Sequence, residues 1–447
     1  MTSRLNLTFL IAAFLFSTFI YSVNLWFSTS GFYLLLATVF LLLVIVFMKK
    51  SIGITLTADF KSILIIILFM FSIFAFTLNV EDVNGFLSLA MWVNRFAMFL
   101  APILILLYFI KKSDKTILYK ILKNKFLLIL LISFIIQLSL IRIVKVPNID
   151  VYQVLRYGPL RLVSLQNPYE TAATNSQFEV KNFGYSHFAY GPATILLFLP
   201  FDLIFHEPRY LLIVANFLAA ISLYKISMRF WSDQEISQII SLIYLFNPRQ
   251  FSFLTFSATD VLITSLFFLG ILFFLNRRYV LSGIFLALTV SVKIFYALPL
   301  LFLLKNENFA NKKIVLAGIL AFFALHLPFA LLDWKAFYKS IVTINIGGAS
   351  FAQIQRFSLT FSTFIDRQFH YYPPQFVFPL LAVISVIVFW LLIPSTVNLA
   401  KMLTIIGLVF ITTIFLGPIG NSNYYFTASQ ILLLAIAASG SKKLIHV

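Results

Sequence analysis

Residues 260–304 decide the fold class, and their sequence is DVLITSLFFLGILFFLNRRYVLSGIFLALTVSVKIFYALPLLFLL. Their charged side chains are Asp260 at the start, Arg277 and Arg278 between two apolar runs, and Lys293 inside the second run. A bilayer core is about 30 Å thick, and about 20 apolar residues cross it as a helix. Because only a helix satisfies all its backbone hydrogen bonds within one segment in lipid, these runs predict an all-α membrane protein.

The same pattern covers most of the chain, in which 61% of the 447 residues are hydrophobic and 11% are charged. Apolar runs this long and this frequent exclude a soluble protein. We therefore expect a polytopic membrane helix bundle of about 12 to 14 spans, with re-entrant or interfacial helices among them. Besides 260–275, the expected spans are 5–27, 31–48, 62–80, 93–110, 125–141, 209–227, 236–247, 314–331, 375–393, 400–416 and 424–440.

Basic residues mark the ends of the apolar runs and orient the chain. The sequence carries 33 Lys and Arg against 15 Asp and Glu, a formal charge of +18. These cations lie in short loops between spans instead of forming one basic face, which favours cytoplasmic anchoring over nucleic-acid binding. With the loops at 49–50, 111–125, 277–278 and 305–313 in the cytoplasm, residues 142–190 form an extracytoplasmic loop.

Two segments must be unusual for this topology to close. Residues 192–206 are short and bracketed by Pro192, Pro200 and Pro208, so we expect a re-entrant or surface-lying hairpin that returns to the outer face. Residues 279–304 join two basic loops, so we expect two short helices that break near Lys293. An ammonium group in such a break is costly without an anion beside it.

Polar motifs gather in the loop 142–190 and directly after it. Asp150 and Tyr152 follow an apolar run, and then come Asn-Pro-Tyr at 167–169 and Phe-Ala-Tyr-Gly-Pro at 188–192. An ionisable group at a membrane boundary is costly and is usually retained for function. We therefore expect this loop to form an extracytoplasmic active site in which Asp150 is central.

No nucleotide-binding signature occurs in the sequence. There is neither a Walker loop nor a glycine-rich dinucleotide fingerprint, and the cytoplasmic loops are short. An activated substrate is therefore expected to arrive from the membrane or from the outer side. Cysteine is absent, which excludes disulfides and thiolate metal sites. We expect no metal and no cofactor, because no spacing of His, Asp and Glu resembles a metal site.

The order of these motifs resembles the glycosyltransferase C superfamily over residues 126–310, in particular the bacterial family 87 of polyprenyl-phosphate-mannose-dependent mannosyltransferases. The series continues with Asn247-Pro248, the polar stretch 257–260 and the Lys-Ile-Phe-Tyr sequence at 293–296. The resemblance implies a GT-C fold that moves a sugar, above all mannose, from a polyprenyl-phosphate donor to a glycolipid or glycan acceptor of the cell envelope. It further implies a prokaryotic plasma membrane with an outward-facing site, and membrane lipids as partners.

The chain departs from that superfamily's pattern at several points. Four expected spans precede the helix that is normally first, Gln166 stands where Gly is usual, and Val151 replaces a second carboxylate. The implied division is 1–125 as additional transmembrane helices, 126–310 as the catalytic core with outer loop 142–190, and 311–447 as C-terminal transmembrane helices with outer loop 332–374.

Sugar transfer from a lipid phosphate assigns roles to the candidate residues. A carboxylate at the boundary can accept the acceptor's proton, so Asp150 is the expected general base; its alternative role is to cap a helix start. A phosphate leaving group needs cationic stabilisation, for which Lys293 is the first candidate and Arg356 a weaker one. Snorkelling to the interface is the alternative for Lys293.

Substrate contacts are expected from polar and aromatic side chains near the outer face. The set is Tyr152, Asn167, Tyr169, His187, Tyr190 and Asp260. Asp260 is expected either to contact the sugar or to pair with Lys293. The alternatives are an aromatic belt for the tyrosines and plain solvation for His187.

Two other function classes fit a nucleotide-free membrane protein. A lipid or solute transporter could use Asp150, Asp260 and Lys293 for ion coupling, but it should show broken helices in paired inverted repeats. The sequence indicates one broken hairpin, at 279–304, without a matching partner. A membrane glycan polymerase is expected to carry arginine-rich outer loops, and the outer loops here are only modestly basic. The glycosyltransferase is therefore the preferred prediction.

Overall fold

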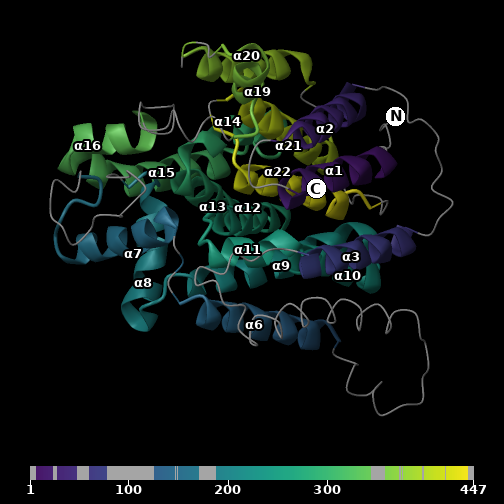
Figure 1. Ribbon diagram of the computed structural model, residues 1–447, viewed down its shortest axis with the longest axis horizontal. Helices are drawn as coiled ribbons and strands as arrows, with labels where there is room; N and C mark the ends of the chain where they lie inside the picture. The colour runs from purple at the N-terminus through teal and green to yellow at the C-terminus, as the bar shows by residue number, and fades with distance from the viewer. Residues whose placement is uncertain are drawn as a thin grey trace.

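The computed structural model describes residues 7–23, 28–47, 60–77 and 125–440, the last range with gaps at 146, 148, 171–187, 344–357, 372–373, 375, 395–396 and 418. All regular structure within these residues is helical (Figure 1). The predicted all-α class is therefore confirmed.

The bounds of the helices follow in chain order. They are α1 (Leu7–Val23), α2 (Thr29–Phe47), α3 (Phe60–Thr77), α6 (Lys125–Ile143), α7 (Asp150–Val163), α8 (Pro192–Phe205), α9 (Tyr210–Trp231), α10 (Gln234–Leu245), α11 (Pro248–Thr255), α12 (Asp260–Leu275), α13 (Tyr279–Val292), η2 (Ile294–Tyr296), α14 (Ala297–Leu300), η3 (Leu301–Lys305), α15 (Lys312–Leu332), α16 (Trp334–Tyr338), η4 (Lys339–Thr343), α19 (Phe361–Phe369), α20 (Val377–Leu392), α21 (Leu399–Leu416) and α22 (Ser422–Ala437).

Length and composition identify the helices that can cross a bilayer. In the described part of the chain, α2, α9, α15 and α21 are long and apolar enough, and the bent pair α11–α12 would make a fifth span. Shorter apolar helices, among them α1, α13 and α20, complete a polytopic helical membrane protein. The described helices overlap every predicted span except 93–110, which lies outside the described residues. The total of 12 to 14 spans stays a prediction.

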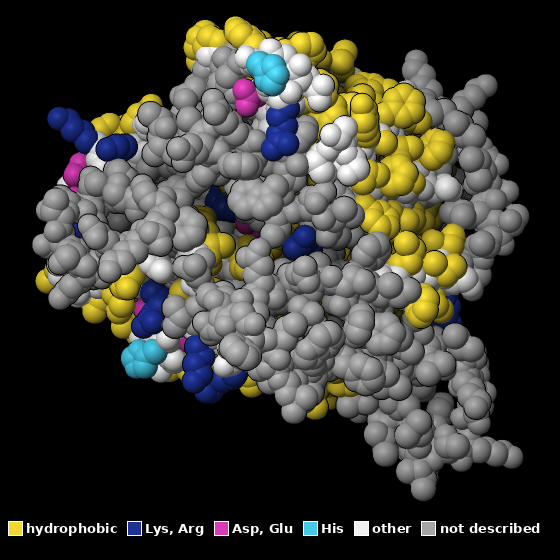
Figure 2. Space-filling model, viewed as in Figure 1, with side chains coloured by type: hydrophobic (Ala, Val, Ile, Leu, Met, Phe, Trp, Pro, Cys, Tyr) yellow, Lys and Arg dark blue, Asp and Glu magenta, His cyan; other side chains and the backbone are white. Residues whose placement is uncertain are grey.

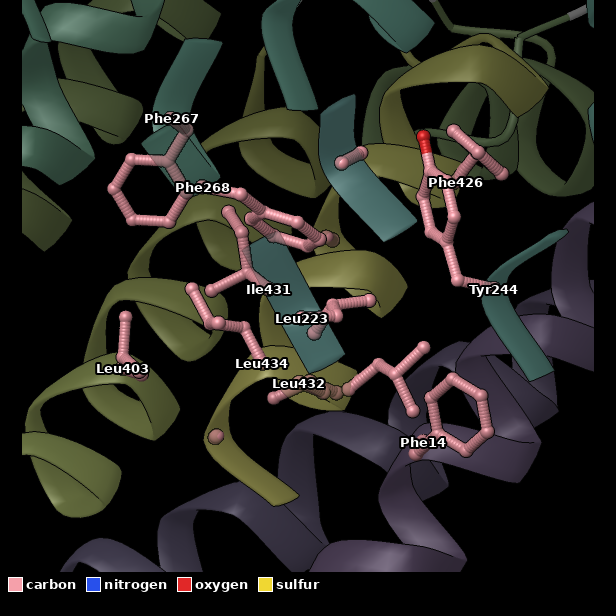
Figure 3. Close-up of a cluster of buried hydrophobic side chains, with 14 of the residues drawn as sticks. Phe14, Leu223, Tyr244, Phe267, Phe268, Leu403, Phe426, Ile431, Leu432 and Leu434 are labelled. Atoms are coloured by element: carbon pink, nitrogen blue, oxygen red, sulfur yellow. The ribbon is translucent and has the colours of Figure 1, made fainter. Parts of the chain in front are cut away.

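Helix α22 forms the centre of the bundle. Every side chain from Tyr425 to Ala437 is buried, as expected for a helix that is apolar on all sides. Figure 3 shows its Phe426, Ile431, Leu432 and Leu434 in one cluster with labelled side chains of α1, α9, α10, α12 and α21. By contrast, only 17% of the spanning window of α15 is buried, so that helix lies at the periphery.

A buried polar network joins four helices beside this core. Asn216 of α9 donates to Gln137 of α6 at 2.8 Å and accepts from Tyr244 of α10 at 3.2 Å. Gln250 of α11 donates to Tyr244 at 3.0 Å and also to Asn216. In a bilayer the apolar faces of helices do not discriminate among partners, so such hydrogen bonds help to select them.

Two helical segments are broken, and the break at Lys293 was predicted. Helix α11 ends at Thr255 and α12 begins at Asp260, with the two axes bent by 117° and Ser257 in the left-handed region at φ 60°. Helix α13 ends at Val292, Lys293 is extended, and the chain continues as short helical turns to Lys305. The first break means that the hairpin at 279–304 is not the only broken helical segment.

The segment 192–206 is a single helix, so the predicted hairpin is wrong. Pro192 occupies the first helical position, where its missing amide hydrogen costs nothing, and Pro200 lies inside α8 without ending it. The helix has 14 residues. At 1.5 Å per residue it is about 21 Å long, shorter than the bilayer core.

Candidate active site

Asp260 is the centre of a buried polar cluster at the start of α12. Lys293 donates to its Oδ2 at 2.7 Å and Asn423 donates to the same oxygen at 2.6 Å. The Tyr296 hydroxyl donates to Oδ1 at 2.7 Å, and Thr427 donates to Oδ1 at 3.4 Å. Both oxygens of this fully buried carboxylate therefore have two donors each, which compensates for the loss of water.

Lys293 is held at the break between α13 and the turns that follow it. Its ammonium lies 4.8 Å from the centre of the Tyr424 ring and 5.7 Å from that of Tyr190, both within cation–π range. Its side chain is 6% exposed, and its ionic partner in the described residues is Asp260. The structure thus pairs the two residues instead of placing Lys293 as a cation that snorkels into open solvent.

The start of α8 fixes the backbone of this break. The Gly191 amide donates to the Val292 carbonyl at 2.9 Å, and the Ala193 amide donates to the Ser291 hydroxyl at 3.2 Å. A Cβ at Gly191 would collide with the Ser291 carbonyl oxygen. Glycine at this position therefore allows two backbones to approach closely, and it carries the neighbouring Tyr190 to Lys293.

Asn167 and Tyr169 build the loop that precedes the cluster. The Asn167 side chain accepts from the Tyr169 amide at 3.0 Å, which forms a tight turn. The Tyr169 hydroxyl donates to the Tyr190 carbonyl at 3.1 Å, and its ring packs edge-on against Phe188 and Phe337. Burial raises the pKa of the Tyr169 phenol well above its usual range, so this group stays protonated and keeps donating. Tyr169 thus holds the backbone of Tyr190 in place.

Arg209 holds the chain on both sides of Asp150. This fully buried guanidinium donates to Glu207 at 2.8 and 2.6 Å and to the Lys145 carbonyl at 3.2 Å. It also lies 4.9 Å from the centre of the Tyr152 ring. Because Lys145 precedes Asp150 and Tyr152 follows it, one side chain anchors the entry into α7.

Asp150 is the first residue of α7, and Ile149 occupies the N-cap position without a side-chain cap. The N-cap of α7 is therefore one residue before Asp150, for which capping the helix start was the alternative role. The Asp150 side chain lies outside the described part of the structure, and so do His187 and Arg356. Helix α7 packs on α8, which in turn meets the break at Lys293, so Asp150 and Lys293 are connected through α8.

Two members of the cluster, Asn423 and Thr427, were not predicted. They lie four residues apart on α22, and this spacing places both on one helical face toward Asp260. The available signal was the polar start of an otherwise apolar helix, Asn-Ser-Asn at 421–423. The remote partner could not be identified from that signal.

The cluster offers one cation that is balanced by one carboxylate. A phosphate close to Lys293 would compete with Asp260 for the ammonium, whereas Asp260 cannot accept a proton without losing donors.

Figure 2 shows a hollow near the middle of one face of the molecule, with basic and acidic side chains at its floor. Among the described residues, no three His, Asp or Glu side chains lie together as metal ligands.

Comparison with known proteins identifies the class of the chain. No curated protein matches its sequence. A family profile, described as Glycosyltransferase family 87, matches residues 188–437. The match covers more than half of the chain and includes Tyr190, Asp260, Lys293 and Asn423. The chain therefore belongs to glycosyltransferase family 87.

Proposed function

We propose that this glycosyltransferase moves a sugar, above all mannose, from a polyprenyl-phosphate donor to a glycolipid or glycan acceptor of the cell envelope. The reaction takes place on the extracytoplasmic face of a prokaryotic plasma membrane. The observation that carries the proposal is the buried Lys293 ammonium, which lies between Asp260 and two tyrosine rings at a helix break. A cation in such a place is suited to an anion that enters from the lipid.

Lys293 binds the donor phosphate, and Arg356 of the outer loop 332–374 assists it. The acceptor oxygen attacks the anomeric carbon as the bond from that carbon to the phosphate oxygen breaks. The electron pair leaves with the phosphate, whose added charge the Lys293 ammonium stabilises. No general acid is needed for such a leaving group, and the anomeric configuration is inverted.

Asp150 accepts the acceptor's proton as general base. It lies in the outer loop 142–190, and the anchor at Arg209 supports the backbone on both sides of it. The catalytic core is 126–310, flanked by the transmembrane regions 1–125 and 311–447.

The sugar is bound by side chains that surround the base and the phosphate site. Tyr190 presents a ring beside Lys293, and Asp260 orients the ammonium. Tyr169 and Asn167 keep Tyr190 in place through the turn and the hydrogen bond described above. Tyr152 and His187 provide further contacts from the same loop.

The donor class tests the proposal. Purified protein in detergent is given radiolabelled polyprenyl-phosphate mannose or a nucleotide-activated mannose, each with a lipid extract of the host envelope as acceptor. We expect transfer from the lipid donor alone. Transfer from the nucleotide sugar in the absence of polyprenyl phosphate would contradict the proposal.

Substitutions at Lys293 connect the donor with the site. Lys293→Ala should weaken donor use much more than Lys293→Arg, which keeps the charge with a changed geometry. Lys305→Ala is the matched control, because Lys305 ends the same broken segment and contacts Trp390 at 4.7 Å instead of the cluster. If folded Lys293→Ala protein used the donor as well as the control does, the phosphate would be bound elsewhere.

A further inference from the structure

A groove between α9 and α12 lies apart from the candidate active site. Its volume is about 430 Å³. Each helix lines it with residues at spacings of three and four, which form one continuous stripe along that helix. The stripes include Leu218, Ile221 and Lys225 of α9, and Leu269, Leu272 and Asn276 at the end of α12.

The groove is apolar along one part and basic at one end. Leu218 is 40% exposed, so its apolar wall is open to the surroundings of the bundle. Lys225 and Arg278 are exposed lining residues at the other end, and Arg229 reaches the same end by donating to Asn276 at 3.3 Å. This contact also places the C-terminal ends of α9 and α12 side by side.

The basic end has no carboxylate to balance it in the part of the chain that the structure describes. Lys225, Arg229 and Arg278 form no ion pair there. Of the nearest acidic residues along the chain, Asp233 caps the start of α10 and Glu235 pairs with Lys61. The end of the groove is therefore electropositive.

This groove cannot be the donor-phosphate site proposed above. Asp260 is the first residue of α12, whereas Asn276 and Arg278 follow its last turn. The helix has 16 residues. At 1.5 Å per residue, the two ends are about 24 Å apart.

We propose that the groove binds an anionic phospholipid of the bilayer. The headgroup phosphate lies between Lys225 and Arg278, and one acyl chain follows the apolar stripes past Leu218 and Leu272. A zwitterionic lipid would leave the cations without a net countercharge. A soluble anion would make no use of the apolar walls. Only an anionic lipid matches both parts of the groove.

Lipid binding is measured directly on the intact protein. Native mass spectrometry of detergent-purified protein counts bound phosphatidylglycerol and phosphatidylcholine over a lipid titration. Each Lys or Arg near an anionic lipid surface contributes roughly fivefold in affinity, so Lys225→Gln/Arg278→Gln should weaken the tightest phosphatidylglycerol site roughly 25-fold. Both side chains are exposed, and an unchanged melting temperature checks that the fold is retained.

A matched control separates this site from general surface charge. Lys312→Gln/Lys313→Gln removes two exposed cations at the start of α15, outside the groove, and should leave the affinity unchanged. Leu269→Trp places a bulkier side chain in the apolar part of the groove. It should weaken lipid binding while all cations remain. The proposal is overturned if the control pair loses as much affinity as the groove pair or if the groove pair loses none. It is equally overturned if glycerophosphoglycerol, the headgroup without chains, binds as tightly as the lipid.

Discussion

Removing one partner of the Lys293–Asp260 pair should destabilise the protein far more than removing both. The two groups are 2.7 Å apart, and their side chains are 6% and 0% exposed. Loss of one member of a buried pair leaves an uncompensated charge and costs about 3–5 kcal/mol. Lys293→Met should fall at the low end, about 3 kcal/mol, because Tyr296, Asn423 and Thr427 still donate to the carboxylate.

Asp260→Asn should fall at the high end of the same range, about 5 kcal/mol. The amide keeps one accepting oxygen and has an NH2 group in place of the other, so it cannot accept from all four donors, and the Lys293 ammonium loses its countercharge. The double variant Lys293→Met/Asp260→Asn contains no buried charge. It should lie within about 1.5 kcal/mol of the parent protein, close to the net value of one hydrogen bond.

Stability and turnover should therefore separate in the double variant. Unfolding is followed by titration with denaturant in mild detergent, and turnover is measured with the lipid-phosphate donor. We expect recovered stability without recovered turnover, because the phosphate ligand is missing. If the stability losses of the two single variants simply add, the pair is not coupled. If the double variant turns over like the parent protein, Lys293 does not bind the leaving phosphate.

Three further predictions concern the anchor at Arg209, the buried polar network and the membrane topology. Arg209→Lys keeps the charge but cannot bridge Glu207 and the Lys145 carbonyl together. Turnover should therefore fall roughly 10- to 100-fold, because the base is misplaced. A parental rate would show that Arg209 does not position Asp150. Asn216→Leu breaks the network with Gln137 and Tyr244 and should cost about 1–2 kcal/mol in unfolding experiments with turnover unchanged; an unaltered stability would contradict it. In this chain without native cysteine, Leu165→Cys should react with a membrane-impermeant reagent from outside and Asn308→Cys should not; the reverse pattern would place the loop 142–190 in the cytoplasm.

Much of the fold was predictable because the membrane imposes local rules. Apolar length locates a helix without knowledge of its neighbours, and the predicted span 260–275 has the bounds of α12. Helix α9 extends to Trp231, past the predicted end at 227, because backbone hydrogen bonds continue after hydropathy falls at Lys225 and Arg229. The polar breaks before Asp260 and at Lys293 were visible because ionisable groups are costly in apolar runs.

Contacts between distant segments could not be predicted. Asn423 meets Asp260 across 163 positions of sequence, and nothing in the local pattern of α22 identifies that partner. Arg209 lies between Pro208 and an apolar run, yet it is the largest side chain that is fully buried among the described residues. Its partner Glu207 is two residues away, but the Lys145 carbonyl and the Tyr152 ring are brought to it only by tertiary packing.

Turnover of Asp150→Asn tests the central claim most directly. Asp150 is the first residue of α7, where a carboxylate contributes about 0.3–1 kcal/mol through the helix dipole. The nearly isosteric amide should therefore leave folding and donor binding close to those of the parent protein. It cannot accept the acceptor's proton, so turnover with polyprenyl-phosphate mannose should fall about 10²–10⁴-fold. A folded Asp150→Asn protein that retains more than about a tenth of parental turnover would contradict the account, since that loss is smaller than a general base contributes.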